Sequence, residues 1–132
     1  MSEPRAQICL IDDDLFVRDA LALGLSDAGY RVLTAPGAAA GFDIAQREFV
    51  AALVTDMNMP GTSGAQLISE ARARWPDMPI VAISGAGVID GRSIHEVARE
   101  LGADAALTKP FRARDLAALL AELIESRAVR HK

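Results

Sequence analysis

The sequence alternates short apolar runs with segments of helical periodicity, and this alternation constrains the fold more than any other feature. In the helical segments, apolar residues recur every three or four positions. Five apolar runs of strand length cover residues 8–11, 30–35, 51–55, 80–84 and 105–108. Strands that alternate with helices at short intervals form a parallel sheet through right-handed crossovers. We therefore expect a doubly wound, five-stranded α/β domain with helices on both faces of the sheet.

The helical segments carry ordinary start and stop signals. Helices are expected over about residues 14–28, over 38–47, from Leu67 to before Pro76, from Ile94 to Leu101, and over Leu116 to Ile124. Gly41 falls within the second of these segments and predicts a weakened helix there. Gly102 follows the fourth segment, where it is expected to end the helix.

The length of the chain fits one domain. A chain of 132 residues, 51% of them hydrophobic, can bury a single core and has no room for a second. We place the domain at residues 7–126, with an N-terminal extension over residues 1–6. Residues 127–132 are polar and basic, and they predict a frayed C-terminal tail.

Charge and hydropathy exclude several functional classes. The net charge of -4 has its signs interspersed, which argues against direct contact with nucleic acid. Apolar runs all fall short of membrane-spanning length, so we expect no membrane segment. The single cysteine, Cys9, cannot form an internal disulfide, and a cytoplasmic location is expected.

Charged residues follow three of the apolar runs. Asp12, Asp13 and Asp14 follow the first run, Asp56 follows the third, and Lys109 follows the fifth. The carboxyl ends of parallel strands lie at one edge of the sheet, where open α/β folds bind ligands. We therefore expect the carboxylates and the lysine to meet at this edge.

Such a cluster favours a metal ion and a phosphoryl group. Converging carboxylates repel one another unless a cation is present, and oxygen ligands suit Mg²⁺, which is often shared with phosphate. Lys109 offers a charge to a phosphoryl oxygen, and Ser84 offers a hydroxyl at the end of the fourth run. Asp56 is then the candidate nucleophile, which would form an acyl phosphate.

Each of these residues also has an ordinary structural interpretation. A lone Asp after a strand is most often a cap or turn residue, and Asp14 fits a helix N-cap. Ser84 alone would more often be a turn hydroxyl, and Lys109 alone a surface charge. Their matching positions at strand ends favour the functional interpretation, although the assignment within residues 12–14 stays ambiguous by one position.

At this point the pattern resembles the receiver domains of two-component response regulators. The resemblance covers Ile8 to about Glu125, and it rests on Asp12-Asp13, Asp56 with Met59-Pro60 and Gly64, Ser84, and Lys109-Pro110-Phe111. It implies a sheet of strand order 2-1-3-4-5. It also implies a signalling switch that takes a phosphoryl group from a histidine kinase or a histidine phosphotransfer protein, and then changes its affinity for an unidentified output partner.

The resemblance also implies a role for each site residue. Four residues match the Mg²⁺ site of the family: Asp12, Asp13, Asp56 and Asn58 through its backbone carbonyl. Asp56 matches the phosphoryl acceptor, Ser84 the hydroxyl that moves toward the phosphoryl group, and Lys109 the lysine that pairs with it. The Lys109–Pro110 peptide bond is expected to be cis. The domain would assist its own phosphorylation and dephosphorylation without being an enzyme.

One position departs from the family pattern. Receivers commonly carry an aromatic residue three positions before the lysine, and here that residue is Ala106. With no ring to rotate, we expect signalling to depend on the loop over residues 85–87 and on the fourth helix. A homodimer through the fourth and fifth helices is left open.

Other functions fit parts of the pattern. Aspartyl-phosphate phosphatases of the haloacid dehalogenase type also place a nucleophilic Asp after a strand, but they need a second Asp two residues later, where this chain has Asn58. A binding module with a vestigial phosphorylation site is a further alternative, and the joint presence of the acids, the hydroxyl and the lysine argues against it. As a receiver, the chain is a stand-alone regulator, a phosphorelay shuttle or a domain excised from a longer chain.

Overall fold

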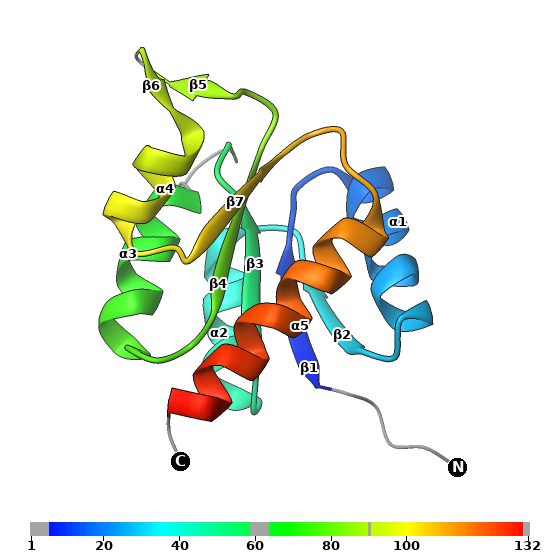
Figure 1. Ribbon diagram of the computed structural model, residues 1–132. Helices are drawn as coiled ribbons and strands as arrows, with labels where there is room; N and C mark the ends of the chain where they lie inside the picture. Colours follow the sequence, from blue (N-terminus) through cyan, green and yellow to red (C-terminus); the bar gives the residue numbers. More distant parts are fainter. Residues whose placement is uncertain (1–5, 59–63, 90, 131–132) are drawn as a thin grey trace.

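A five-stranded parallel sheet forms the centre of the molecule (Figure 1). The computed structural model describes residues 6–58, 64–89 and 91–130. The strands of the sheet are β1 (Gln7–Ile11), β2 (Arg31–Ala35), β3 (Ala52–Asp56), β4 (Ile80–Ser84) and β7 (Ala105–Thr108). Their order is β2-β1-β3-β4-β7. Since β7 is the fifth strand of this sheet along the chain, the predicted order 2-1-3-4-5 is confirmed.

Helices cover both faces of the sheet, as the alternating pattern predicts (Figure 1). On one face lie α1 (Leu15–Asp27) and α5 (Ala113–Arg130). The other face is covered by α2 (Ala38–Arg47), α3 (Gly64–Arg74) and α4 (Ile94–Leu101). The central strands β3 and β4 are buried along their whole length, which explains why their sequences are continuous apolar runs.

The strand register brings the candidate site residues to one edge. Asp56, the last residue of β3, pairs with Ile83 of β4, and Ser84 pairs with Thr108 of β7. Asp12 and Lys109 directly follow the ends of their strands. The chemistry-bearing residues therefore lie at the carboxyl edge of the sheet, as expected from the parallel topology.

The glycine in α2 does not interrupt that helix. Gly41 faces β1, and a Cβ at this position would lie 2.1 Å from Cδ1 of Ile11. The missing side chain lets α2 approach the sheet closely, so the helix continues from Ala38 to Arg47. The low helix propensity of Gly41 is therefore offset by the packing of α2 against β1, which a propensity scale does not include.

A small hairpin between β4 and α4 is absent from the sequence-based expectation. It consists of β5 (Val88–Ile89) and β6 (Arg92–Ser93), which pair antiparallel above the carboxyl edge of the sheet (Figure 1). The Ile94 N–H donates to the carbonyl of Gly87 at 2.9 Å, which closes the base of the hairpin. Ser93 caps α4, since its Oγ accepts the N–H of Glu96 at 3.2 Å.

The last helix extends further than expected. The prediction of a frayed tail from residue 127 is wrong as far as Arg130, where α5 ends. The apolar period that reveals a helix ends at Ile124, whereas Glu, Ala and Arg continue a helix through their own propensity. Residues 1–5 of the expected N-terminal extension lie outside the described residues.

At the amino edge of the sheet, Arg72 of α3 ties several elements together. Its Nε donates to the carbonyl of Gly102 at 2.8 Å, and its Nη1 donates to the carbonyl of Pro76 at 2.8 Å. Its Nη2 contacts Oδ2 of Asp104 at 2.8 Å, and the same oxygen accepts the N–H of Ile80. These bonds join the ends of α3 and α4 to the start of β4.

Candidate functional site

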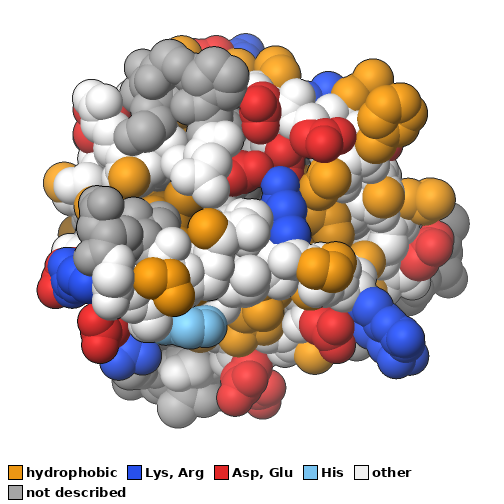
Figure 2. Space-filling view, turned by 90° about the horizontal axis from the view of Figure 1, so that it is seen from above, with side chains coloured by type: hydrophobic (Ala, Val, Ile, Leu, Met, Phe, Trp, Pro, Cys, Tyr) orange, Lys and Arg blue, Asp and Glu red, His pale blue; other side chains and the backbone are white. Residues whose placement is uncertain are grey.

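Three carboxylates converge at the carboxyl edge of the sheet. Asp12, Asp13 and Asp56 each place a carboxylate oxygen within 4.8 Å of the others. Asp12 is fully buried and Asp56 is 4% exposed, whereas Asp13 is exposed. Figure 2 looks onto this edge and shows acidic side chains gathered around a basic one near the middle of the face. The predicted acidic cluster is therefore present.

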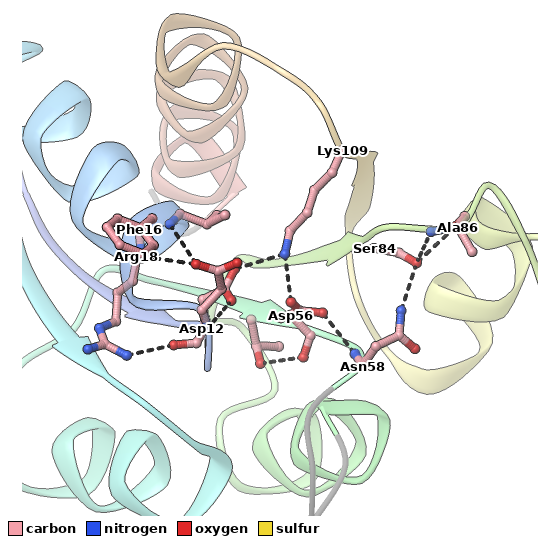
Figure 3. Close-up of polar contacts among 11 residues, drawn as sticks. Asp12, Phe16, Arg18, Asp56, Asn58, Ser84, Ala86 and Lys109 are labelled. Atoms are coloured by element: carbon pink, nitrogen blue, oxygen red, sulfur yellow. Dashed lines mark hydrogen bonds and ion pairs between the residues drawn. The ribbon is translucent and has the colours of Figure 1, made fainter.

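Lys109 bridges the two buried carboxylates (Figure 3). Its Nζ donates to Oδ2 of Asp56 at 2.8 Å and lies 3.1 Å from Oδ2 of Asp12. The backbone N–H of Lys109 donates to the carbonyl of Ser84 at 2.8 Å, which anchors the lysine to the neighbouring strand. The Lys109–Pro110 peptide bond is cis, as predicted. One cation thus partly neutralises two acids.

Burial and neighbouring charges shift the pKa values of Asp12 and Lys109. Desolvation raises the pKa of Asp12, and the hydrogen bond from the Asp14 N–H and the contact with Lys109 offset this only in part. Desolvation alone would lower the pKa of Lys109, but its hydrogen bond to Asp56, its close contact with Asp12 and the negative charges of both acids raise it overall. Lys109 is therefore firmly protonated, and Asp12 carries an incompletely compensated charge.

One buried oxygen of Asp12 lacks a hydrogen-bond partner among the described residues. Oδ1 accepts the N–H of Asp14 at 2.9 Å, but Oδ2 receives no hydrogen bond from the described residues, and the contact with Lys109 is an ion pair without hydrogen-bond geometry. A fully buried carboxylate oxygen in this state is costly. Oxygen ligands from several acids at such a point fit a hard divalent cation. The side chains of the cluster therefore fit the predicted metal.

The turn after β1 resolves the ambiguity among the three consecutive acids. Asp14 is the N-cap of α1, because its Oδ1 accepts the N–H groups of Phe16 at 2.9 Å and Val17 at 3.2 Å. Asp12 and Asp13 are left to form the cluster with Asp56. The sequence-based interpretation of Asp14 as the helix start is confirmed.

Residues on both sides of Asp56 hold it in place. The backbone N–H of Asn58 donates to Oδ1 of Asp56 at 2.8 Å, and Thr55 Oγ1 donates to the carbonyl of Asp56 at 3.1 Å. With Lys109 on Oδ2, both carboxylate oxygens of Asp56 are oriented. The role of the Asn58 carbonyl as a metal ligand stays a prediction, and residues 59 and 60 of the predicted motif lie outside the described residues.

Ser84 is brought to the same edge, but within the described part of the chain its hydroxyl makes no hydrogen bond to the acids. It is fully buried, and its Oγ donates to the carbonyl of Ala86 at 2.9 Å. The same Oγ accepts the N–H of Ala86 at 3.1 Å and the side-chain amide of Asn58 at 3.3 Å. In this structure the hydroxyl is therefore held within its own turn.

Two features of the site are missing from the sequence-based expectation. The Nη1 of Arg18 donates to the backbone carbonyl of Asp12 at 2.9 Å and so supports the turn that carries the acids. Phe16, in the first turn of α1, is 84% exposed beside the cluster (Figure 3). Arg18 lies one helical turn after the N-cap, on a long side chain that can reach back, which is the one sequence signal available.

Among the described residues, no helix combines the length and apolar character that crossing a membrane requires.

The chain matches the model of the response regulator receiver domain over residues 8–121. The response regulator protein FleR of Pseudomonas aeruginosa is 35% identical over 116 residues, which are 88% of this chain and 24% of FleR. The transcriptional regulatory protein FixJ of Azorhizobium caulinodans is 38% identical over 112 residues, 85% of this chain and 50% of FixJ. The chain thus spans a half or less of these relatives.

Solved structures of single receiver domains match the whole fold. A response regulator receiver domain protein from Clostridium thermocellum has a TM-score of 0.85 at 28% identity and covers 94% of this chain and 98% of that one. A CheY-like receiver domain protein from Methanospirillum hungatei has a TM-score of 0.86 at 26% identity and covers 98% of this chain and 99% of that one. The chain therefore belongs to the receiver domains of response regulators, the phosphorylation-dependent switches of two-component signalling.

Proposed function

We propose that Asp56 accepts a phosphoryl group from a phosphohistidine, with Mg²⁺ held by Asp12, Asp13, Asp56 and the backbone carbonyl of Asn58. The observation that carries this proposal is the arrangement around Lys109, whose Nζ lies 2.8 Å from Asp56 and 3.1 Å from Asp12. An ammonium group between two buried acids, beside a carboxylate oxygen without a hydrogen bond, suits a site that binds a dianionic group together with a cation.

The transfer needs no group beyond the donor and the metal. A carboxylate oxygen of Asp56 forms a bond to phosphorus while the phosphorus–nitrogen bond of the phosphohistidine breaks, and the bonding electrons return to the imidazole. Bound Mg²⁺ would neutralise charge on the phosphoryl oxygens. Lys109 stabilises the same charge, and the Asn58 N–H keeps the carboxylate of Asp56 in a fixed orientation.

The donor is a histidine kinase or a histidine phosphotransfer protein, and the domain acts on itself rather than as an enzyme on other substrates. Phosphorylation changes its affinity for an output partner, or passes the group onward if the chain is a phosphorelay shuttle. Support for a protein donor comes from Leu15 and Phe16, which are 52% and 84% exposed beside the acids. A reducing cytoplasm suits the free, buried thiol of Cys9.

The test uses a small phosphodonor. Incubation with Mg²⁺ and acetyl phosphate should add one phosphoryl group, detected as an acid-stable, base-labile mass increase. Asp56→Ala and chelation of Mg²⁺ should each abolish the increase. Asp19→Ala, which removes an exposed acid of α1, is the matched control and should label like the wild type. Labelling that persists in Asp56→Ala, or none in the wild type, would contradict the proposal.

A further inference from the structure

The hydroxyl of Ser84 has all of its hydrogen-bonding positions filled. A serine hydroxyl donates one hydrogen bond and accepts two. Here it donates to the carbonyl of Ala86 at 2.9 Å and accepts from the Ala86 N–H at 3.1 Å and from Nδ2 of Asn58 at 3.3 Å. The side chain is fully buried, so water does not compete for these positions.

Asn58 connects this hydroxyl to the phosphoryl acceptor (Figure 3). Its backbone N–H donates to Oδ1 of Asp56 at 2.8 Å, while its side-chain amide donates to Ser84 Oγ. Two donors of one residue thus contact the two groups that the proposed phosphorylation must bring together. Of these two contacts, a substitution of the side chain removes only the one to Ser84.

We propose that the Asn58 side chain is a positioning residue that holds Ser84 in the resting turn and so sets the equilibrium between the resting and phosphorylated conformations. This inference rests on the proposed function of Asp56. To reach a phosphoryl group on Asp56, the Ser84 hydroxyl must give up the bond from Asn58 together with its bonds to Ala86. The free energy of these contacts therefore opposes the free energy that the contact between Ser84 and the phosphoryl group contributes to the phosphorylated conformation.

The release of Ser84 would reach α4 through the backbone. Ala86, which binds the hydroxyl, is followed by Gly87, and the carbonyl of Gly87 accepts the N–H of Ile94 at 2.9 Å. Ile94 is the first residue of α4 and is 1% exposed, so it is packed into the core. The turn that Asn58 stabilises is therefore attached directly to the helix that is expected to move.

The experiment compares the wild type with Asn58→Ala, Ser84→Ala and the double variant, using beryllium fluoride with Mg²⁺ as the phosphoryl mimic. Losing one net hydrogen bond should make Asn58→Ala bind the mimic about two- to tenfold more tightly. Without the mimic, its amide resonances over residues 84–94 should move toward their positions in the wild-type complex. In the Ser84→Ala background, the same substitution should change neither quantity.

Controls separate folding from positioning. Gln46→Ala removes an exposed side-chain amide on α2, and it should leave affinity and resonances unchanged. Urea unfolding verifies that each variant is folded. Unchanged affinity and resonances in Asn58→Ala would overturn the inference. An effect of Asn58→Ala that is equally large in the Ser84→Ala background would also overturn it, because Asn58 would then act on the phosphoryl group itself. If the wild type fails to bind the mimic, the proposed function fails, whereas the resonances of the unliganded variants still report on the contact.

Discussion

Gly64, the first residue of α3, lies against the backbone of Asp56. A Cβ at position 64 would be 1.8 Å from the carbonyl oxygen of Asp56 and 2.8 Å from its carbonyl carbon. The start of α3 and the end of β3 are therefore in direct backbone contact. This explains why the motif that follows the acceptor includes a glycine at this position.

Gly64→Ala should destabilise the domain and displace Asp56, because the backbone on both sides of the contact must move. Overpacking of this kind costs about 1–3 kcal/mol of unfolding free energy. Urea unfolding measures the loss, and Gly85→Ala is the control because an added Cβ there meets no atom within 4 Å. Equal stability of the two variants would show that the contact at Gly64 relaxes without cost.

Asp12→Asn should stabilise the metal-free protein while removing its response to Mg²⁺. The pKa of Asp12 is raised in the fold, so ionisation of this group opposes folding above its unfolded pKa. A neutral Asn avoids this cost, and Lys109 keeps its bond to Asp56. Thermal unfolding with Mg²⁺ and with a chelator measures both effects.

The pH dependence provides the check on this explanation. As pH falls through the folded pKa of Asp12, the carboxylate of the wild type takes up a proton. The free-energy cost of burying an ionised Asp12 then disappears, and the stability of the wild type should approach that of Asp12→Asn. Asp19→Asn, at an exposed position of α1, is the control for the loss of one carboxylate from the same region. A stability difference that stays constant with pH would show that ionisation of Asp12 is not the cause.

Phe16→Ser should slow phosphotransfer from a phosphorylated histidine phosphotransfer protein, because Phe16 is 84% exposed next to the acids. Loss of an aromatic anchor at an interface costs about 1–2 kcal/mol, or about five- to thirtyfold in rate. Labelling by acetyl phosphate should be unchanged, since a small donor needs no docking surface.

Phe49→Ser is the control for this prediction. Phe49 is 90% exposed, but it precedes β3 and lies at the opposite edge of the sheet. Its substitution should leave transfer from both donors intact. Equal slowing by the two variants, or slowing with acetyl phosphate as well, would argue against a docking role of Phe16.

Ala106→Tyr should destabilise the domain by about 1–3 kcal/mol rather than restore an aromatic relay. Ala106 is 4% exposed and belongs to the core cluster that contains Ile94 and Ala98 of α4, so a ring would have to displace that helix. Thr108→Tyr, on the same face of β7 but exposed, is the control for urea unfolding. Unchanged stability of Ala106→Tyr would reveal space for a ring.

The positions of Asp12, Asp56, Ser84 and Lys109 could be predicted because they depend on topology alone. Parallel strands end at a common edge, so a residue that follows a strand can be assigned to that edge without knowing any side-chain conformation. The apolar runs and helical periods were sufficient for this purpose. The N-cap role of Asp14 was also predictable, since capping depends on local sequence.

The features that escaped prediction depend on contacts between chain segments. The β5–β6 hairpin has strands of two residues each, too short to show a period, and a backbone bond between Gly87 and Ile94 closes its base. The contact of the Asn58 amide with Ser84 depends on the conformation of two turns at once. The close approach of Gly41 to Ile11 likewise needs the packed structure.

The bonds made by Arg72 determine how α4 can move. Arg72 fixes the carbonyl of Gly102 at the carboxyl end of α4, while the amino end is joined to the hairpin through Ile94. We therefore expect any displacement of α4 to be a tilt about Gly102, with the smallest travel at that end. For a helix of 8 residues, a tilt of about 10° moves the amino end by about 2 Å. The surface that α4 offers to a partner should then change most at its amino end, next to the hairpin, and least beside Gly102.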